Sequence, residues 1–275
     1  MKKYLLFCLS LIFLYPSTLH ATRIALVAKV HVIPDQDWME VKVTVENQGD
    51  EDALVVSPQL KLGEEEVMLH HIPKLEPNHS HQWTYRFEIR RLGFQLRGSY
   101  PLLLRTHYHD VNYYPFSMPE VLLLHYQIEP SDPPLKGSLG VESVSHTGKA
   151  MVNLTNLSQH DLSGTVELFL PSELVSLTPK TPFRLAKAHG METTFQLENG
   201  WALRGSSYRV YAIVQWVHSD THYTLALPQL ITVVGYKRTG SVLPRIVGGI
   251  LFLIILFMAT LYVEIKKVAQ ENEPA

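Results

Sequence analysis

Two histidines followed by an aspartate are the residues of this sequence whose types and spacing best suit metal chemistry. His107 and His109 are separated by one residue, and Asp110 comes next. Because side chains alternate between the faces of a strand, both imidazoles would lie on one face, where a metal ion can bind them. A metal site needs a third or fourth ligand, and the sequence identifies none. Two interpretations stay open: a metal site, or exposed side chains near a hairpin tip.

Aromatic residues follow directly and could bind a partner. Tyr113, Tyr114 and Phe116 surround a proline at what we expect to be the end of a hairpin. Clustered aromatic side chains on a surface are typical of binding sites, because apolar area left in water is costly. We predict a protein-contact surface here. The alternatives are rings that stack on sugars, and rings that cover the end of a core or the joint between domains.

The sequence motifs of common enzymes are missing. The chain contains no G-x-S-x-G, no H-E-x-x-H and no calcium-binding loop. Its one cysteine, Cys8, lies in an N-terminal segment that we expect to be removed, which leaves no thiol for catalysis and no disulfide. The net charge of −2 offers no basic surface for nucleic acid. We expect a protein that is not an enzyme, needs no cofactor and has no nucleic-acid partner.

Apolar segments at both ends predict export and anchoring. Residues 1–21 open with two lysines, continue with an apolar stretch and end at Ala21, as a signal peptide does. Residues 246–263 are apolar and uncharged. As a helix they would extend about 27 Å, close to the ~30 Å hydrocarbon core of a bilayer. We expect a single-pass protein of the plasma (inner) membrane, with its domains in the periplasm, a juxtamembrane linker at 237–245 and a cytoplasmic tail at 264–275.

The segment between these ends repeats itself at a spacing of about 108 residues. The stretch 96–100 (LRGSY) recurs at 203–208 (LRGSSY), and 119–124 (PEVLLL) matches 228–233 (PQLITV). Asn47 matches Asn156, an offset of 109 (156 − 47). A period of this length indicates a duplicated domain. We predict one domain at 22–129 and another at 130–236, joined by a proline-rich, rather stiff connector over 129–134.

Each copy has the pattern of β-structure throughout. Residues 41–46 (VKVTVE) and 83–89 (WTYRFEI) alternate apolar and polar side chains with a period of two. About seven short strands per copy, separated by turn residues, predict an antiparallel sandwich. We expect the four tryptophans, Trp38, Trp83, Trp201 and Trp216, to fill the two cores, one pair in each.

These elements resemble a known group of modules. The V-x-V-x-V-x-N-x-G-D string over 41–50, the proline turn over 75–80 (LEPNHS) and the strand opening at 98–100 (GSY) are similar to bacterial Ig-like modules of the CARDB and NEW types. The second copy departs from this pattern, because 186–190 (AKAHG) replaces the proline turn. The resemblance implies two tandem Ig-like sandwiches and an adhesive, spacer or assembly role, without an active site.

The sequence therefore predicts a non-enzymatic membrane protein that presents two Ig-like domains as a scaffold or interaction module of a cell-envelope complex. Its partners would be an envelope or membrane protein and, through residues 246–263, the lipid bilayer. Two other functions stay open: a carbohydrate- or peptidoglycan-binding module, and a histidine-based metal-binding periplasmic protein.

Overall fold

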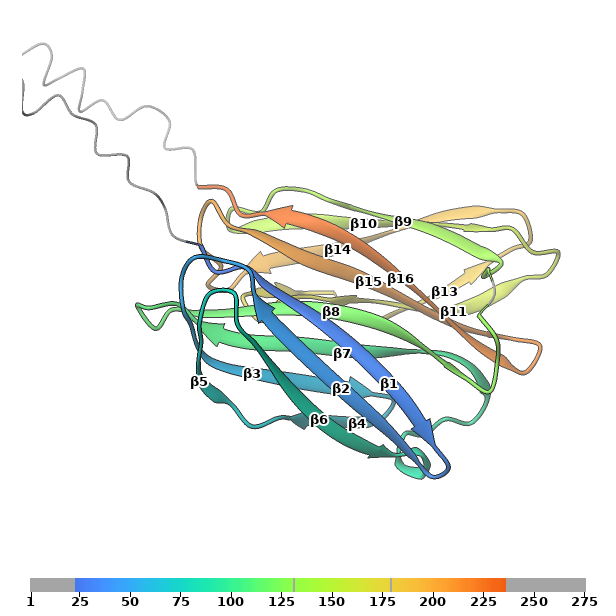
Figure 1. Ribbon diagram of the computed structural model, residues 1–275. Coiled ribbons are helices and arrows are strands. Elements are labelled where there is room, and N and C mark those ends of the chain that lie inside the picture. Colours follow the sequence, from blue (N-terminus) through green and yellow to red (C-terminus); the bar gives the residue numbers. More distant parts are fainter. Residues whose placement is uncertain (1–22, 131, 179, 236–275) are drawn as a thin grey trace, which may run out of the picture. The chain divides into compact units, whose positions relative to one another are not determined.

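The computed structural model describes residues 23–130, 132–178 and 180–235, and this part of the chain is all-β. Its only helical element within those ranges is a 3-10 turn, η1 (Ile89–Arg91). The first half contains β1 (Leu26–Asp35), β2 (Trp38–Asn47), β3 (Ala53–Leu62), β4 (Glu65–Met68), β5 (Ile72–Leu75), β6 (Ser80–Glu88), β7 (Arg97–His109) and β8 (Pro115–Tyr126). The second contains β9 (Leu135–Val141), β10 (Thr147–Asn156), β11 (Leu162–Phe169), β12 (Leu174–Ser176), β13 (Thr181–Leu185), β14 (Gly190–Asn199), β15 (Ser207–His218) and β16 (Thr221–Thr232). Figure 1 shows the layers that they form.

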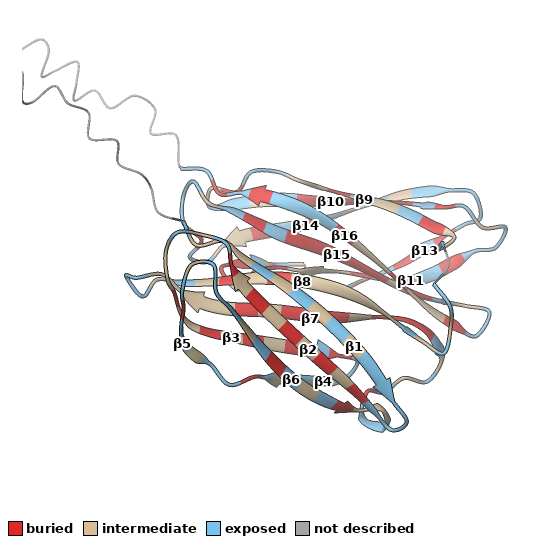
Figure 2. Ribbon diagram, viewed as in Figure 1, coloured by how far each residue is buried: buried red, intermediate tan, exposed pale blue. Residues whose placement is uncertain are grey.

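The strands β1–β8, here called the first sandwich, enclose one hydrophobic core. The sheet β1-β2-β6 faces a sheet in which β7 pairs with β3 and β8, and β3 also pairs with β4 and β5. Val41, Val43 and Val45 on β2 have no exposed area, whereas the residues between them are partly exposed (Figure 2). The alternation of apolar and polar residues in the sequence predicts this alternation of buried and partly exposed side chains. The same core takes in Trp83 and Phe87 from β6 and Leu102 and Leu104 from β7.

The strands β9–β16, here called the second sandwich, enclose a second core. One sheet has the order β12-β14-β10-β9, and the other contains β13, β11, β15 and β16. The central strand β15 is buried on both faces: Val214 and Trp216 point into the core, and Ile213 on the opposite face is also fully buried. Two sheets packed face to face around a shared core give each half a sandwich-like architecture. All described residues up to Val234 belong to one compact unit.

The prediction for the tryptophans is half wrong. Trp83 and Trp216 are buried in the first and second core, with exposed fractions of 1% and 2%. Trp38 and Trp201 are 43% and 47% exposed. Trp38 opens β2 on the face opposite to the valines, and Trp201 lies in the loop after β14, so neither side chain reaches a core.

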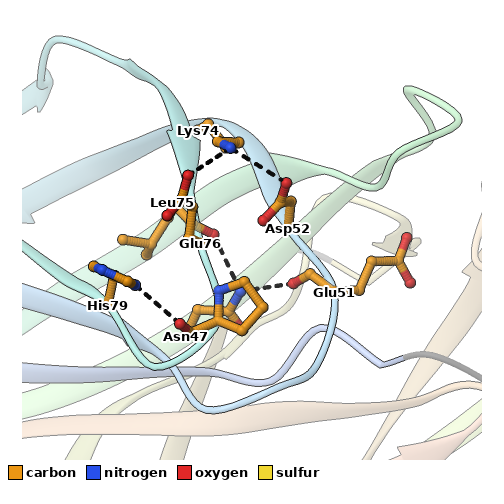
Figure 3. A network of polar contacts seen from close by, with 8 residues as sticks. Asn47, Glu51, Asp52, Lys74, Leu75, Glu76 and His79 are labelled. Atoms are coloured by element: carbon orange, nitrogen blue, oxygen red, sulfur yellow. Dashed lines mark hydrogen bonds and ion pairs between the residues drawn. The ribbon is translucent and has the colours of Figure 1, made fainter.

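A buried asparagine gives the two sandwiches the same internal joint. Asn47 and Asn156 end β2 and β10 and have no exposed area. Nδ2 of Asn47 donates to the carbonyl oxygens of Glu51 (2.7 Å) and Leu75 (3.1 Å), as Figure 3 shows. Nδ2 of Asn156 donates to the carbonyl oxygens of His160 (2.7 Å) and Leu185 (3.3 Å). Each amide side chain thus hydrogen-bonds backbone carbonyl groups that have no partner in the sheet near a strand end. Most buried polar side chains are hydrogen-bonded in this way, often to the backbone.

The turn opposite each asparagine also repeats, although its sequence does not. The backbone N–H groups of Asn47 and Asn156 donate to the carbonyl oxygens of His79 (3.0 Å) and His189 (2.9 Å). The residue before each histidine, Asn78 or Ala188, has a positive φ of 59° or 55°. The departure of residues 186–190 from the proline turn is therefore a change of side chains and not of backbone conformation.

Four predictions fall outside the described residues. They are the signal peptide over 1–21, the linker over 237–245, the membrane span over 246–263 and the tail over 264–275. Within the described ranges, none of the elements is a helix of the length and apolar character that crossing a bilayer requires.

Candidate functional site

The two sandwiches meet along β7 and β8 of the first and β15 and β16 of the second, and the contact is rich in buried polar groups. Its least exposed carboxylate is Glu173, in the turn between β11 and β12, which has no exposed area. Glu173 accepts two hydrogen bonds from Ser117 on β8, one from the backbone N–H and one from Oγ, both at 2.7 Å. The Ser117 hydroxyl in turn accepts from the N–H of Ser172 at 2.7 Å. Both carboxylate oxygens of Glu173 therefore accept hydrogen bonds, and the Ser117 hydroxyl both donates and accepts.

Burial determines the electrostatics of this contact. It raises the pKa of Glu173 above its ordinary value, and the hydrogen bonds from Ser117 oppose that rise. The backbone carbonyl of Glu173 also accepts from the N–H groups of Gly200 (3.0 Å) and Trp201 (3.2 Å). One residue thus ties the loop after β14 to the first sandwich.

A second contact lies at the opposite end of the same strands. Gly98 on β7 pairs with His222 on β16, a short parallel joint that connects the two sheets. The carbonyl of Ser99 accepts from Oγ1 of Thr224 (2.8 Å) and lies 2.8 Å from Nδ1 of His222. The His222 ring stacks on Tyr100, with centroids 4.2 Å apart. Burial lowers the pKa of His222, so the neutral imidazole is favoured in this stack.

A third contact is an ion pair with a tyrosine. Glu120 on β8 accepts from Nη1 of Arg209 (2.5 Å) and from the hydroxyl of Tyr211 (2.6 Å), both on β15. Burial and the Glu120 carboxylate raise the pKa of Tyr211, which keeps its hydroxyl protonated and donating. These contacts use three successive stretches of the joint, and together they hold the sandwiches side by side.

A groove of about 640 Å³ runs along one end of this joint. Its lining includes Arg23, Glu51, Tyr108, Asp110, Tyr208 and Arg209. Burial raises the pKa of Tyr108 and of Tyr208, so both phenols stay neutral at physiological pH. The groove therefore offers aromatic faces, hydroxyls and charges of both signs, and Arg209 is already paired with Glu120.

The structure places the predicted metal residues in other roles. Nε2 of His107 lies 3.1 Å from Oε1 of Gln59, and burial, with help from Arg105 and His109, lowers the pKa of His107. Asp110 accepts from the backbone N–H groups of Asn112 (2.9 Å) and Tyr114 (2.8 Å) and so shapes the hairpin turn. Among the described residues, no group of three or more His, Cys, Asp or Glu side chains converges as a metal site would require.

The predicted aromatic residues do not form one surface. Phe116 packs against the core of the second sandwich, and the hydroxyl of Tyr114 donates to the carbonyl of Trp201. Both side chains therefore lie at the joint between the sandwiches, which was one of the alternatives. Tyr113 differs from them, because it is 67% exposed at the hairpin tip and has a positive φ of 60°.

No sequence pattern predicts the residues that form the contact between the sandwiches. Ser117 lies in an apolar strand and Glu173 in a turn, 56 residues apart in the chain. Two features of the sequence could point to this contact: the serine within the largely apolar stretch 115–124, and the second LRGS stretch at 203–206. Neither signal names a partner residue.

Comparisons with known proteins leave the family open. No family model and no curated protein matches the chain. Among solved structures, a red sea bream transglutaminase is 15% identical, with a TM-score of 0.29, over 81% of this chain and 34% of that one. The native conformation of Escherichia coli alpha-2-macroglobulin is 10% identical, with a TM-score of 0.32, over 78% of this chain and 17% of that one. The YadV chaperone is 14% identical, with a TM-score of 0.31, over 74% of this chain and 98% of that one. This chain thus spans about a third or less of the first two proteins, and likeness at this level carries no argument about function. The resemblance to CARDB-type and NEW-type modules stays a prediction.

Proposed function

We propose that this chain is an exported, single-pass membrane protein that presents two Ig-like sandwiches outside the cytoplasm as an interaction module of a cell-envelope complex. The signal-peptide pattern over 1–21 and the apolar segment over 246–263 support export and anchoring. The proposal includes the plasma (inner) membrane as the location and a non-enzymatic role.

The observation that carries the proposal is the use of buried polar groups between the sandwiches. The described carboxylate with the least exposure, Glu173, joins β8 to the second sandwich. Buried polar groups that are hydrogen-bonded to one another make a structure more rigid and favour one arrangement of its parts. If the two sandwiches keep a fixed orientation relative to each other, a partner can contact surfaces of both at the same time, which suits assembly into a complex.

Site-specific photo-crosslinking in native membranes tests the interaction. A crosslinking residue is placed at exposed positions of each sandwich, at Met68 (53% exposed) in the first and at Leu177 (57%) in the second. We expect a discrete protein adduct from at least one position, and its loss when Glu173→Ala loosens the joint. The buried Val43 position is the control and yields no intermolecular adduct. If a scan of all exposed positions yields no protein adduct, the proposal is contradicted.

Protease treatment of intact spheroplasts tests export. We expect digestion of the region 22–235 from outside and protection of the tail over 264–275. If the region 22–235 survives until the membrane is lysed, the chain is not exported and the location is wrong.

A further inference from the structure

One end of the described unit carries large exposed side chains from two separate loops. Val111 and Tyr113, in the β7–β8 hairpin, are 52% and 67% exposed, and Trp201 and Leu203, in the loop after β14, are 47% and 36% exposed. The hydroxyl of Tyr114 donates to the carbonyl of Trp201, which holds the two loops against each other. We call these four exposed residues the aromatic end. Single exposed apolar residues are common on proteins, but these four lie on two loops that a hydrogen bond joins.

The described chain begins and ends at the aromatic end (Figure 1). The N–H of Gly205 donates to the carbonyl of Val233 (2.7 Å), and the N–H of Val233 donates to the carbonyl of Ser206 (2.9 Å). The loop that carries Trp201 and Leu203 is therefore directly beside the last described residues. Arg23, the first described residue, lines the same groove as Gly205.

The length of the chain beyond Val234 limits how far this end can be from a bilayer. Ten residues, 236–245, separate Gly235 from the predicted span. A fully extended chain covers at most ~3.3–3.6 Å per residue, so this tether reaches about 35 Å or less. Since the aromatic end lies where the tether begins, it is the part of the described unit that a short tether keeps nearest to the lipid.

The residue types at this end match the chemistry of the membrane surface. Trp and Tyr are enriched at membrane–water interfaces, where the apolar ring and the polar N–H or O–H group are each satisfied. Tyr113 and Trp201 each combine an exposed aromatic ring with a polar O–H or N–H group, and Val111 and Leu203 on the same two loops add exposed apolar area. Arg204, exposed next to Leu203, supplies a cation that can meet a phosphate.

We infer that the aromatic end docks on the surface of a lipid bilayer, with Trp201 and Tyr113 at the level of the headgroups. This inference rests on the proposed membrane anchor. The acidic turn after β2 lies at the same end, where Asp50 accepts from the N–H of Arg23. Docking therefore depends on ring burial rather than on anionic lipid, and zwitterionic phosphatidylcholine suffices.

The test uses tryptophan fluorescence of the full chain in phosphatidylcholine vesicles, with and without bromine on the upper part of the acyl chains, because bromine quenches at short range. All four tryptophans lie among the described residues, and two of them are buried. We expect lower emission in the brominated vesicles and loss of that difference in Trp201→Phe. Trp38→Phe is the matched control, because Trp38 is 43% exposed and pairs with Asp35 at the far end of β1. Ten residues at ~3.3 Å place it about 33 Å from the aromatic end.

Two results overturn the inference. One is equal emission of the unaltered chain in brominated and unbrominated vesicles, and the other is quenching that Trp201→Phe leaves unchanged. Flotation of the same vesicles separates this failure from failure of the anchor: a chain that does not float with the lipid lacks the anchor, whereas one that floats without quenching of Trp201 is anchored but not docked. Tyr113→Ser provides a second variant, with reduced quenching of Trp201 as the expected result.

Discussion

Replacement of Glu173 gives the most direct measure of the joint between the sandwiches. In Glu173→Ala, the backbone N–H and the hydroxyl of Ser117 both lose their acceptor in a site where Ser117 is only 4% exposed. A buried polar group left unsatisfied costs about 1–3 kcal/mol. Since removal of a buried carboxylate also relieves its desolvation, we expect a net loss of about 1–3 kcal/mol in the free energy of unfolding.

Glu173→Gln is the matched control, because it keeps the shape of the side chain. Its Oε1 can accept from the N–H of Ser117 and its Nε2 can donate to the hydroxyl, but the hydroxyl hydrogen then loses the acceptor that the carboxylate provides. We expect a smaller loss than in Glu173→Ala at pH 7, because only the hydroxyl of Ser117 loses its acceptor and the backbone N–H keeps one. The assay is denaturant unfolding of the solubilised full chain, followed by tryptophan fluorescence.

The pH dependence supplies an independent check with a defined sign. Because burial raises the pKa of Glu173 above 4.5, the folded protein binds more protons than the unfolded chain between the two pKa values. The contribution of Glu173 to the free energy of unfolding therefore falls as the pH rises from about 4.5 through the raised pKa, and is level above it. The free energy of unfolding of the unaltered chain, minus that of Glu173→Gln, should therefore decrease over the same pH range. A flat difference from pH 4 to 8, or a loss below ~0.5 kcal/mol in Glu173→Ala, refutes our account of the joint.

Two further predictions use the internal repeat as a source of controls. Asn47→Ala and Asn156→Ala should each lower the free energy of unfolding by about 2–4 kcal/mol, since each leaves several backbone groups without partners. Fluorescence of Trp83 and Trp216 should show which sandwich unfolds first. If either variant is as stable as the unaltered chain, the role given to these amides is contradicted. Gly98→Ala should cost more than Gly205→Ala by about 1–3 kcal/mol, because a Cβ on Gly98 would lie 2.0 Å from the carbonyl oxygen of His222, whereas one on Gly205 meets no atom within 4 Å. Gly98 and Gly205 have positive φ values of 153° and 85°, and thermal unfolding of the two variants measures the difference; a reversed order contradicts the role given to the close approach.

The candidate site shows where prediction from sequence stops. The aromatic residues over 113–116, which the sequence predicts as one partner-binding surface, have different environments: Phe116 packs on the second core and Tyr113 is exposed. Period-two alternation places side chains on the two faces of a strand, and it does not say which face meets another domain. The histidines at 107 and 109 share a face as predicted, and the neighbour on that face is Gln59, which no local pattern reveals.

What the sequence determined alone is local: the alternation of Val41, Val43 and Val45, the turn residues that end the strands, and the repeat that relates Asn47 to Asn156. These features follow from side-chain period and backbone conformation, which act over a few residues. The tertiary structure alone decided which tryptophans are buried and that Ser117 bonds to Glu173. Such contacts join residues far apart in the chain, and their energy arises only when two finished sheets exclude water from the surface between them.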